Sequence, residues 1–163
     1  MTSTPSSPST PSAPSTPDLR RTVERFWAAA EKRDWAAFAE TLAEDVLYEL
    51  PQTRERIRGR ERYVQFNREY PGDWHARIER IVAEPGPVRD TEQPDRPDRP
   101  DQPGQPDQPG QVVSWTYVTV GLEEMYAISF FTGDSDGRIA TVTDFWPEPY
   151  EPPAGREHLV ERY

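Results

Sequence analysis

The chain has 163 residues, no cysteine and a formal net charge of −10. This length fits one domain, the lack of cysteine excludes disulfides and thiolate metal sites, and the acidic balance argues against nucleic acid as a partner. Without a disulfide framework we expect a cytoplasmic protein, and no stretch is long and apolar enough to predict a membrane partner.

Two segments are rich in proline. Of the 19 prolines, five lie in residues 1–17 and eight lie between Pro85 and Pro109. Segments of this composition bury too little apolar surface to offset the entropy of ordering. We therefore expect a disordered tail over residues 1–17, without the features of a signal peptide, and one domain over residues 18–163. A disordered, dispensable loop insertion at about 85–110 interrupts this domain.

Two helices are predicted at the start of the domain. Thr16 can cap the first helix, with Pro17 at its first position and Asp18 near its positive end. Apolar side chains then follow at helical spacing on one face, namely Leu19, Val23, Phe26, Trp27 and Ala30. The second helix begins at Asp34 as N-cap and has three inward side chains, Trp35, Phe38 and Leu42.

A short strand and a third helix come next. Val46, Tyr48 and Leu50 alternate along the chain until Pro51 ends the strand. Residues 52–58 are predicted to be a polar connection. After Gly59, a helical pattern places three rings on one side, those of Tyr63, Phe66 and Tyr70.

Four strands complete the pattern, over residues 74–83, 111–120, 123–132 and 138–146. The second of them is β-branched or aromatic at nearly every position, and the "GDSDG" turn joins the last two. Helices that precede an antiparallel sheet indicate the α+β class.

Three stretches carry a family resemblance: "VERFWAAAEKRDWAAFAETLAEDVLYELP", "GRERYVQFNREYPGDW" and "DGRIATVTDFWPEPYE". Together with the order of elements, they resemble the nuclear transport factor 2-like superfamily, in particular its SnoaL-like, polyketide cyclase-like branch. The resemblance implies a cone-shaped barrel, in which a curved, mainly antiparallel sheet packs around three N-terminal helices. It also implies an apolar pocket for a hydrophobic small molecule, and a homodimer formed through the sheet.

Ketosteroid isomerases are one branch of this superfamily, and their polar groups are missing here. The resemblance implies that their Asp base matches Leu50, their oxyanion-binding Tyr matches Phe26, and their protonated Asp matches Ala127. A hydrocarbon side chain neither removes a proton nor stabilises an enolate. We therefore do not expect isomerisation by that mechanism.

The polyketide cyclases of the family imply a carboxylate in the last strand, and "GRIATVTDFW" places Asp144 there. The histidine that assists them matches Ala127. A four-residue loop would pair Ala127 with Asp144, on a sheet face with apolar neighbours. Poor solvation there would raise the pKa of the carboxyl group, which suits proton transfer, so Asp144 is the candidate catalytic residue. The alternative is a structural acid.

Aromatic side chains at the mouth of a cone favour a flat, apolar ligand. Among the arginines of "RERIRGRER", Arg54 lies nearest the end of the first strand and could reach the pocket. The two histidines are isolated in the sequence and lack a supporting spacing of carboxylates, so no metal site is predicted, and no cofactor is expected. The candidate substrate-binding residues are Tyr48, Phe66, Trp115, Tyr117, Met125, Trp146 and Arg54.

Two classes of function remain open from the sequence. In the first, the protein is a cofactor-free cyclase or isomerase that uses Asp144 as general acid and base on a polyketide-like or terpenoid-like substrate. In the second, it is a non-catalytic ligand-binding or dimerisation module, which the missing histidine partner favours. A pocket that is open and contains a buried acid would favour the enzyme.

Overall fold

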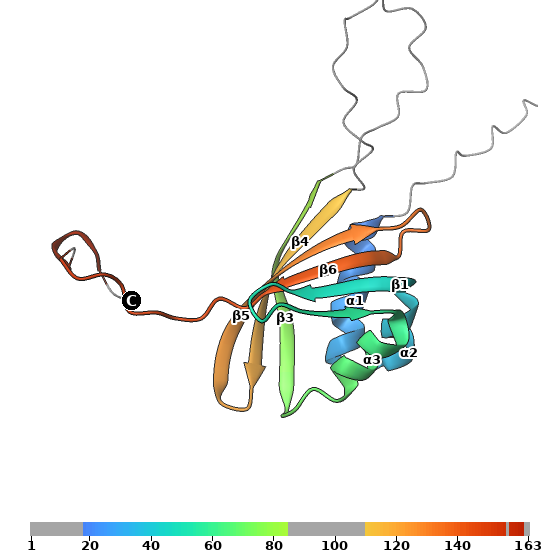
Figure 1. Cartoon of the computed structure of the whole chain (residues 1–163), viewed down its shortest axis with the longest axis horizontal. Helices are drawn as coiled ribbons and strands as arrows, with labels where there is room; N and C mark the ends of the chain where they lie inside the picture. The colour runs from blue at the N-terminus through green and yellow to red at the C-terminus, as the bar shows by residue number, and fades with distance from the viewer. Residues whose placement is uncertain (1–17, 85–109, 156, 162–163) are drawn as a thin grey trace, which may run out of the picture.

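The computed structural model describes residues 18–84, 110–155 and 157–161. The predicted tail and all of the predicted insertion except Gly110 lie outside these residues. The elements follow the order α1 (Leu19–Glu31), α2 (Trp35–Glu40), β1 (Leu42–Leu50), β2 (Glu55–Arg58), α3 (Arg60–Arg68), β3 (Trp74–Glu84), β4 (Gln111–Val120), β5 (Glu123–Gly133), β6 (Ile139–Phe145) and a short 3-10 helix (Glu157–Leu159) (Figure 1).

The six strands form one sheet in the order β2-β1-β6-β5-β4-β3. Only the pairing of β1 with β6 is parallel in the described part of the sheet, and the other neighbours run antiparallel. The three helices lie on one side of the sheet, which curves around them without closing (Figure 1). The predicted α+β class is therefore confirmed.

The helix starts agree with the sequence pattern, with one shift. Asp34 caps α2 as predicted, because its side chain accepts a hydrogen bond from the Ala37 N–H. For α1 the N-cap is Asp18, whose carboxylate accepts from the Arg20 N–H at 3.1 Å, rather than Thr16, which lies outside the described residues. A carboxylate is as good a cap as a hydroxyl and also suits the positive end of the helix.

Leu42 was expected to face inward from the second helix, but the structure places it at the start of β1. The helix ends at Glu40, and the carbonyl of Thr41 accepts a hydrogen bond from the Ile139 N–H at 2.9 Å. Leu42 is fully buried in either arrangement. The apolar spacing that suggested a helical residue was therefore a signal of burial alone.

The polar connection predicted for residues 52–58 contains a strand. Glu55–Arg58 pairs antiparallel with β1, and Ile57 lies opposite Tyr48. This strand forms the edge of the sheet and is mostly exposed, so its side chains carry almost no apolar alternation. Charged residues on an edge strand also oppose pairing with other chains.

The register of the last hairpin differs by two residues from the prediction. Ser129, not Ala127, lies opposite Asp144. The loop is longer than four residues because Asp134 organises it: its side chain accepts from the N–H groups of Asp136 and Arg138. A shift by two keeps every side chain on the same face, so Ala127 and Asp144 still share the inner face.

The core lies between the helices and the concave face of the sheet. The Phe26 ring of α1 is its centre, with ring centroids of Phe38 at 4.6 Å and Phe131 at 5.5 Å. Residues of α1 and α3, which pack on this core, also line a cavity over another part of the concave face.

No helix in the described part of the chain is both long and apolar enough to cross a bilayer.

Candidate functional site

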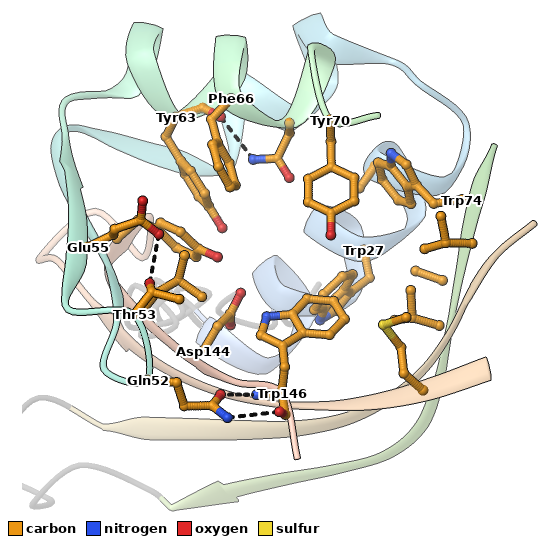
Figure 2. A pocket seen from close by; sticks show the side chains of 18 of the residues that line it. Trp27, Gln52, Thr53, Glu55, Tyr63, Phe66, Tyr70, Trp74, Asp144 and Trp146 are labelled. Atoms are coloured by element: carbon orange, nitrogen blue, oxygen red, sulfur yellow. Dashed lines mark hydrogen bonds between the residues drawn. The ribbon is translucent and has the colours of Figure 1, made fainter. Parts of the chain in front are cut away.

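A cavity of about 430 Å³ lies between α1, α3 and the inner face of the sheet. Figure 2 shows that its side chains converge on one open space from the helices and from the sheet. Eight of its twenty lining residues are aromatic, namely Phe26, Trp27, Tyr48, Tyr63, Phe66, Tyr70, Trp74 and Trp146. This volume and lining are typical of sites for small molecules.

Asp144 lies on β6 and points into this cavity (Figure 2). The parallel pairing of β6 with β1 places Val142 beside Tyr48, so Asp144 and Tyr48 share the inner face. The Asp144 side chain is 5% exposed. Among the described residues, no group forms a hydrogen bond of normal geometry with its Oδ1 atom.

Burial raises the pKa of the Asp144 carboxyl to about 6, and the nearby hydroxyls of Ser129 and Tyr48 oppose this rise by stabilising the charged form. Ser129 lies opposite Asp144 on β5, yet its Oγ atom makes no hydrogen bond of good geometry within the described structure. Two buried polar atoms are thus left with capacity for a ligand or water.

Two tyrosines face the carboxylate. Tyr48 of β1 and Tyr63 of α3 stack with ring centroids 4.5 Å apart. The Tyr63 hydroxyl points toward Asp144 (Figure 2), and the Tyr48 hydroxyl interacts with the same carboxylate. Burial raises the pKa of both phenols, and the charge of Asp144 raises it further. Both tyrosines therefore remain protonated at neutral pH and can act as hydrogen-bond donors.

Ring contacts continue from the tyrosine pair along the wall. Phe66 follows Tyr48 at 5.5 Å, Tyr70 follows Phe66 at 6.1 Å, and Trp74 follows Tyr70 at 6.5 Å. Behind this wall, the Arg33 guanidinium lies 3.6 Å from the centroid of the Trp74 ring and donates to the Trp74 carbonyl. The Trp74 ring is therefore held in place from outside the cavity.

The mouth is organised by a contact between the loop after β1 and the chain after β6. The Gln52 side chain accepts from the Trp146 N–H at 2.6 Å and donates to the Trp146 carbonyl at 2.9 Å. Together the two bonds place the Trp146 indole beside Asp144 (Figure 2). Glu55 and Glu148 also line the cavity, and Glu55 accepts from the Thr53 hydroxyl at 2.7 Å.

The structure brings together five of the eight predicted site residues. Asp144, Tyr48, Phe66, Met125 and Trp146 all line the cavity. Tyr48, Met125 and Asp144 lie on strands of the inner face, Phe66 lies on the inner side of α3, and Trp146 follows the end of β6.

Trp115, Tyr117 and Arg54 do not line the cavity. Trp115 and Tyr117 lie on the outer face of β4, where their rings contact Tyr126 of β5. Alternation along the strand sends their neighbours Ser114 and Thr116 inward instead. Arg54 lies in the exposed turn before β2 with a positive φ of 62°.

Tyr63, Asn67 and Gln52 belong to the cavity but were not predicted as site residues. Tyr63 shares a helical face with Phe66, and this spacing was a usable signal. Gln52 had none, because its role depends on Trp146, which is 94 residues distant in the sequence. Leu50 and Phe26, the two positions at which the resemblance leads us to expect the base and the tyrosine of an isomerase, also line the cavity.

The cavity has an acidic bias. Its ionisable lining groups, in the part of the chain described, are three carboxylic acids and three tyrosines, with no Lys, Arg or His: Asp144, Glu55, Glu148, Tyr48, Tyr63 and Tyr70. Across residues 18–84, 110–155 and 157–161, no three His, Cys, Asp or Glu side chains gather as a candidate metal site.

Three solved structures show the similarity of this fold to known proteins. A proposed ketosteroid isomerase from Kribbella flavida DSM 17836 is 40% identical, with a TM-score of 0.71, over 89% of each chain. A proposed polyketide cyclase from Pseudomonas putida KT2440 is 21% identical, with a TM-score of 0.53, over 79% of this chain and 91% of that one. Orange carotenoid protein from Anabaena (Nostoc) sp. PCC 7120, binding canthaxanthin, is 19% identical, with a TM-score of 0.57, over 77% of this chain and 35% of that one.

No curated protein matches the sequence. The model of the SnoaL-like domain family, however, matches residues 23–142. These residues comprise α1 to β5 and the start of β6, and the fold they form is the one shared with the Kribbella protein. The chain therefore belongs to the SnoaL-like domain family of the nuclear transport factor 2-like superfamily.

Proposed function

We propose that the protein binds a hydrophobic small molecule and acts on it as a cofactor-free cyclase or isomerase. Asp144 is the general acid and base, and a polyketide-like or terpenoid-like compound is the substrate. The observation that carries this proposal is a buried carboxyl group, with its pKa raised to about 6, that faces an aromatic cavity. General bases work best when their pKa lies near the operating pH.

The neighbouring residues support proton transfer at this carboxyl. Ionised Asp144 would accept a proton from a C–H or O–H group of the substrate and return it at another atom. The protonated phenols of Tyr48 and Tyr63 line the same cavity and would donate hydrogen bonds to a substrate oxygen that gains negative charge. The aromatic wall would exclude water and orient the substrate.

The comparisons support the reaction class. The 40% identical Kribbella protein is described as a proposed ketosteroid isomerase, and cyclisation and isomerisation both depend on proton transfer at carbon. The isomerase-like residues are replaced here by Leu50, Phe26 and Ala127. An isomerase of this sequence would therefore use Asp144 from β6 as its base instead.

The test begins with a thermal-shift screen of aromatic polyketide-like and terpenoid compounds, because a ligand of the folded state raises the melting temperature. Hits are then incubated in D2O, and exchange of their acidic protons is followed by NMR. Asp144→Asn, which conserves shape, should retain binding and lose exchange by about 100-fold or more. Exchange at an unchanged rate in the variant contradicts a catalytic Asp144.

Non-catalytic binding is the second candidate function. It is favoured by Ala127, which leaves Asp144 without the histidine partner of the cyclases, and by the unused hydrogen-bonding capacity of Oδ1, which could serve binding alone. In this case hits would raise the melting temperature of the wild type without any exchange into D2O. The Anabaena protein that binds canthaxanthin has the same fold.

We also propose that two copies associate through the outer face of the sheet. Large apolar side chains on this face are half exposed, with Val82 and Trp115 at 49% and Tyr126 at 44%. Patches of this kind mark interaction surfaces. Sedimentation equilibrium should show a dimer that Trp115→Ser weakens, while Leu122→Ser, at an exposed turn, leaves it intact; a monomeric wild type contradicts the proposal.

A further inference from the structure

The ionisable groups that line the cavity indicate which charge its ligand carries. Asp144 lies at the inner end, and Glu55 and Glu148 lie near the mouth around Trp146 and Gln52. Among the lining residues that the structure describes, no cationic side chain balances these acids. An anionic ligand would therefore meet like charge in a poorly solvated space, which costs free energy.

The aromatic wall adds an attraction for positive charge. The faces of aromatic rings carry partial negative charge, and Trp and Tyr attract cations more strongly than Phe does. The Trp146 ring and the Tyr63 hydroxyl lie beside Asp144 in the cavity (Figure 2), and the Tyr48 hydroxyl interacts with the same carboxylate. A carboxylate beside a tryptophan ring and two phenol oxygens offers an alkylated ammonium group both charge and a ring face.

The second observation is that, in the part of the chain that the structure describes, the buried carboxylate of Asp144 lacks a partner at its Oδ1 atom. The Oδ1 atom of Asp144 is buried, and within the described residues it accepts no hydrogen bond of normal geometry. An ammonium group beside it would supply the missing positive partner. A neutral hydrocarbon in the same place would leave the carboxylate both unpaired and further desolvated.

We propose that the cavity selects a hydrophobic ligand that carries a positively charged amine, with the ammonium group against the Asp144 carboxylate and beside the hydroxyl oxygens of Tyr48 and Tyr63 and the ring of Trp146. This inference rests on the proposed function of the cavity as a small-molecule site and narrows its substrate class. An adjacent ammonium group also keeps the carboxylate ionised, which is the form a general base requires.

One cation lies near the wall and does not oppose this proposal. The Arg33 guanidinium stacks on Trp74 at 3.6 Å from the ring centroid, but Arg33 does not line the cavity. Its charge is held by the carbonyls of Ala30, Glu31 and Trp74. The inner end around Asp144 therefore keeps its negative character.

The proposed contact between the ammonium group and Asp144 also predicts how binding depends on pH. The groups that act on the charge of Asp144 are Tyr48 of β1, Tyr63 of α3 and the Ser129 hydroxyl of β5, and both phenols remain neutral throughout. Asp144 is thus the group at the inner end that changes charge between pH 5 and pH 7.5, because burial raises its pKa to about 6. Protonation removes the partner of the ammonium group, so affinity for a cation should fall as pH falls.

Three small probes that differ in charge test the proposal on the full-length protein. Benzyltrimethylammonium is the cation, neopentylbenzene is its uncharged carbon isostere, and phenylacetate is the anion. Binding is followed by intrinsic tryptophan fluorescence, since Trp27, Trp74 and Trp146 line the cavity. At pH 7.5 the cation should bind about tenfold or more tightly than the isostere, and phenylacetate should bind most weakly.

Asp144→Asn should abolish most of the preference for the cation while it retains the affinity for neopentylbenzene, and pH 5 should have the same effect on the wild type. The comparison of probes on the wild type stands even where the variant fails to fold. Equal or tighter binding of neopentylbenzene at pH 7.5 overturns the amine proposal and leaves the hydrophobic site intact. Binding of none of the probes overturns the amine proposal and the small-molecule site together.

Discussion

The two faces of β4 to β6 differ in a way that reverses the usual distribution of large and small side chains. On the inner face of β4, Ser114 and Thr116 are 0% exposed, whereas the large Trp115 between them is 49% exposed on the outer face. On β6, Asp144 faces inward and Phe145 faces outward against Phe130. At these positions the buried face carries the small and polar groups, although Phe131 of β5 is also buried there.

This difference shows how the sheet makes room for a cavity. Small inward residues on β4 give space to rings from the helices: the Trp27 indole of α1 donates to the Ser114 hydroxyl at 3.1 Å. Large inward residues there would occupy that space. Among the described residues no helix covers the outer face, so its rings pack against one another within the sheet.

The largest effect on stability is expected from substitutions at two adjacent phenylalanines of β5, which test the difference between the two faces of the sheet. Phe131 is fully buried against Phe26, and Phe130 lies on the outer face. Phe131→Ala should lower the free energy of unfolding by about 3–5 kcal/mol, because it leaves a cavity in the core. Phe130→Ala, the matched control, should cost about 1 kcal/mol. Urea denaturation measures both, and equal losses would mean that the two faces are equally buried.

The pH dependence of stability tests the inner face. The folded-state pKa of Asp144 is raised to about 6 from its ordinary value of 3.8, so the folded protein holds this proton more tightly. The stability that results is present below about pH 4 and lost as pH rises through 6, a change of about 3 kcal/mol.

Asp144→Asn should remove this change from the curve of unfolding free energy against pH. The difference between wild type and variant isolates Asp144 from the other titrating groups. Glu123→Gln, at an exposed acid of the same sheet, serves as the control and should leave the curve as it is. A variant whose curve runs parallel to the wild type from pH 4 to pH 7.5 would show that Asp144 is solvated.

Filling the inner face should affect binding more than stability. Val118 lines the cavity from β4, next to the outward Tyr117. Val118→Phe should reduce the affinity for the neutral dye Nile red about tenfold or more, since the ring occupies ligand space, and overpacking costs about 1–3 kcal/mol of stability. Tyr117→Phe should leave dye fluorescence unchanged. A loss of binding in Tyr117→Phe alone would place the dye on the outer face.

The smallest effect is expected at a titratable group that faces away from the cavity. His75 of β3 is exposed, and its Nδ1 atom lies 2.8 Å from the Glu31 carboxylate. Hydrogen bonding to Glu31, followed by its charge, raises the pKa of His75. An NMR titration of the ring should show this rise, and Glu31→Gln should reverse most of it. A pKa that does not respond to the substitution would show that the pair is absent in solution.

Much of the fold could be predicted because its signals are local. The apolar spacing of α1 and α3 identified the helical faces, and the alternation of Val46, Tyr48 and Leu50 identified the inner face of β1. Where that alternation is missing, the face could not be assigned. In "VVSWTYVTV" both faces are β-prone, and large rings were expected inside although only their packing partners decide where they lie.

The remaining errors arise from properties that depend on distant residues. The register of the β5–β6 hairpin depends on hydrogen bonds to Asp134, which add length to a loop that the letters alone suggest is short. The two hydrogen bonds between Gln52 and Trp146 join segments that are distant in the sequence, and no local pattern predicts their contact. Asp144 was identifiable because its sequence context resembles that of the cyclase carboxylate, and Tyr63 could have been identified from the helical face that it shares with Phe66.

The parallel pair of β1 and β6 has a consequence for the order of folding. During synthesis the three helices and β1 emerge first, and β6 follows after the whole of β3 to β5. Until β6 is made, one edge of β1 is unpaired. The aromatic residues of the helices and of β1 are then present without Asp144. Contacts between residues about as far apart as Gln52 and Trp146, at 94 positions, close late and slowly. We therefore expect the newly made protein to pass through a stage in which the aromatic groove is exposed and lacks the Asp144 carboxylate, until β6 pairs with β1.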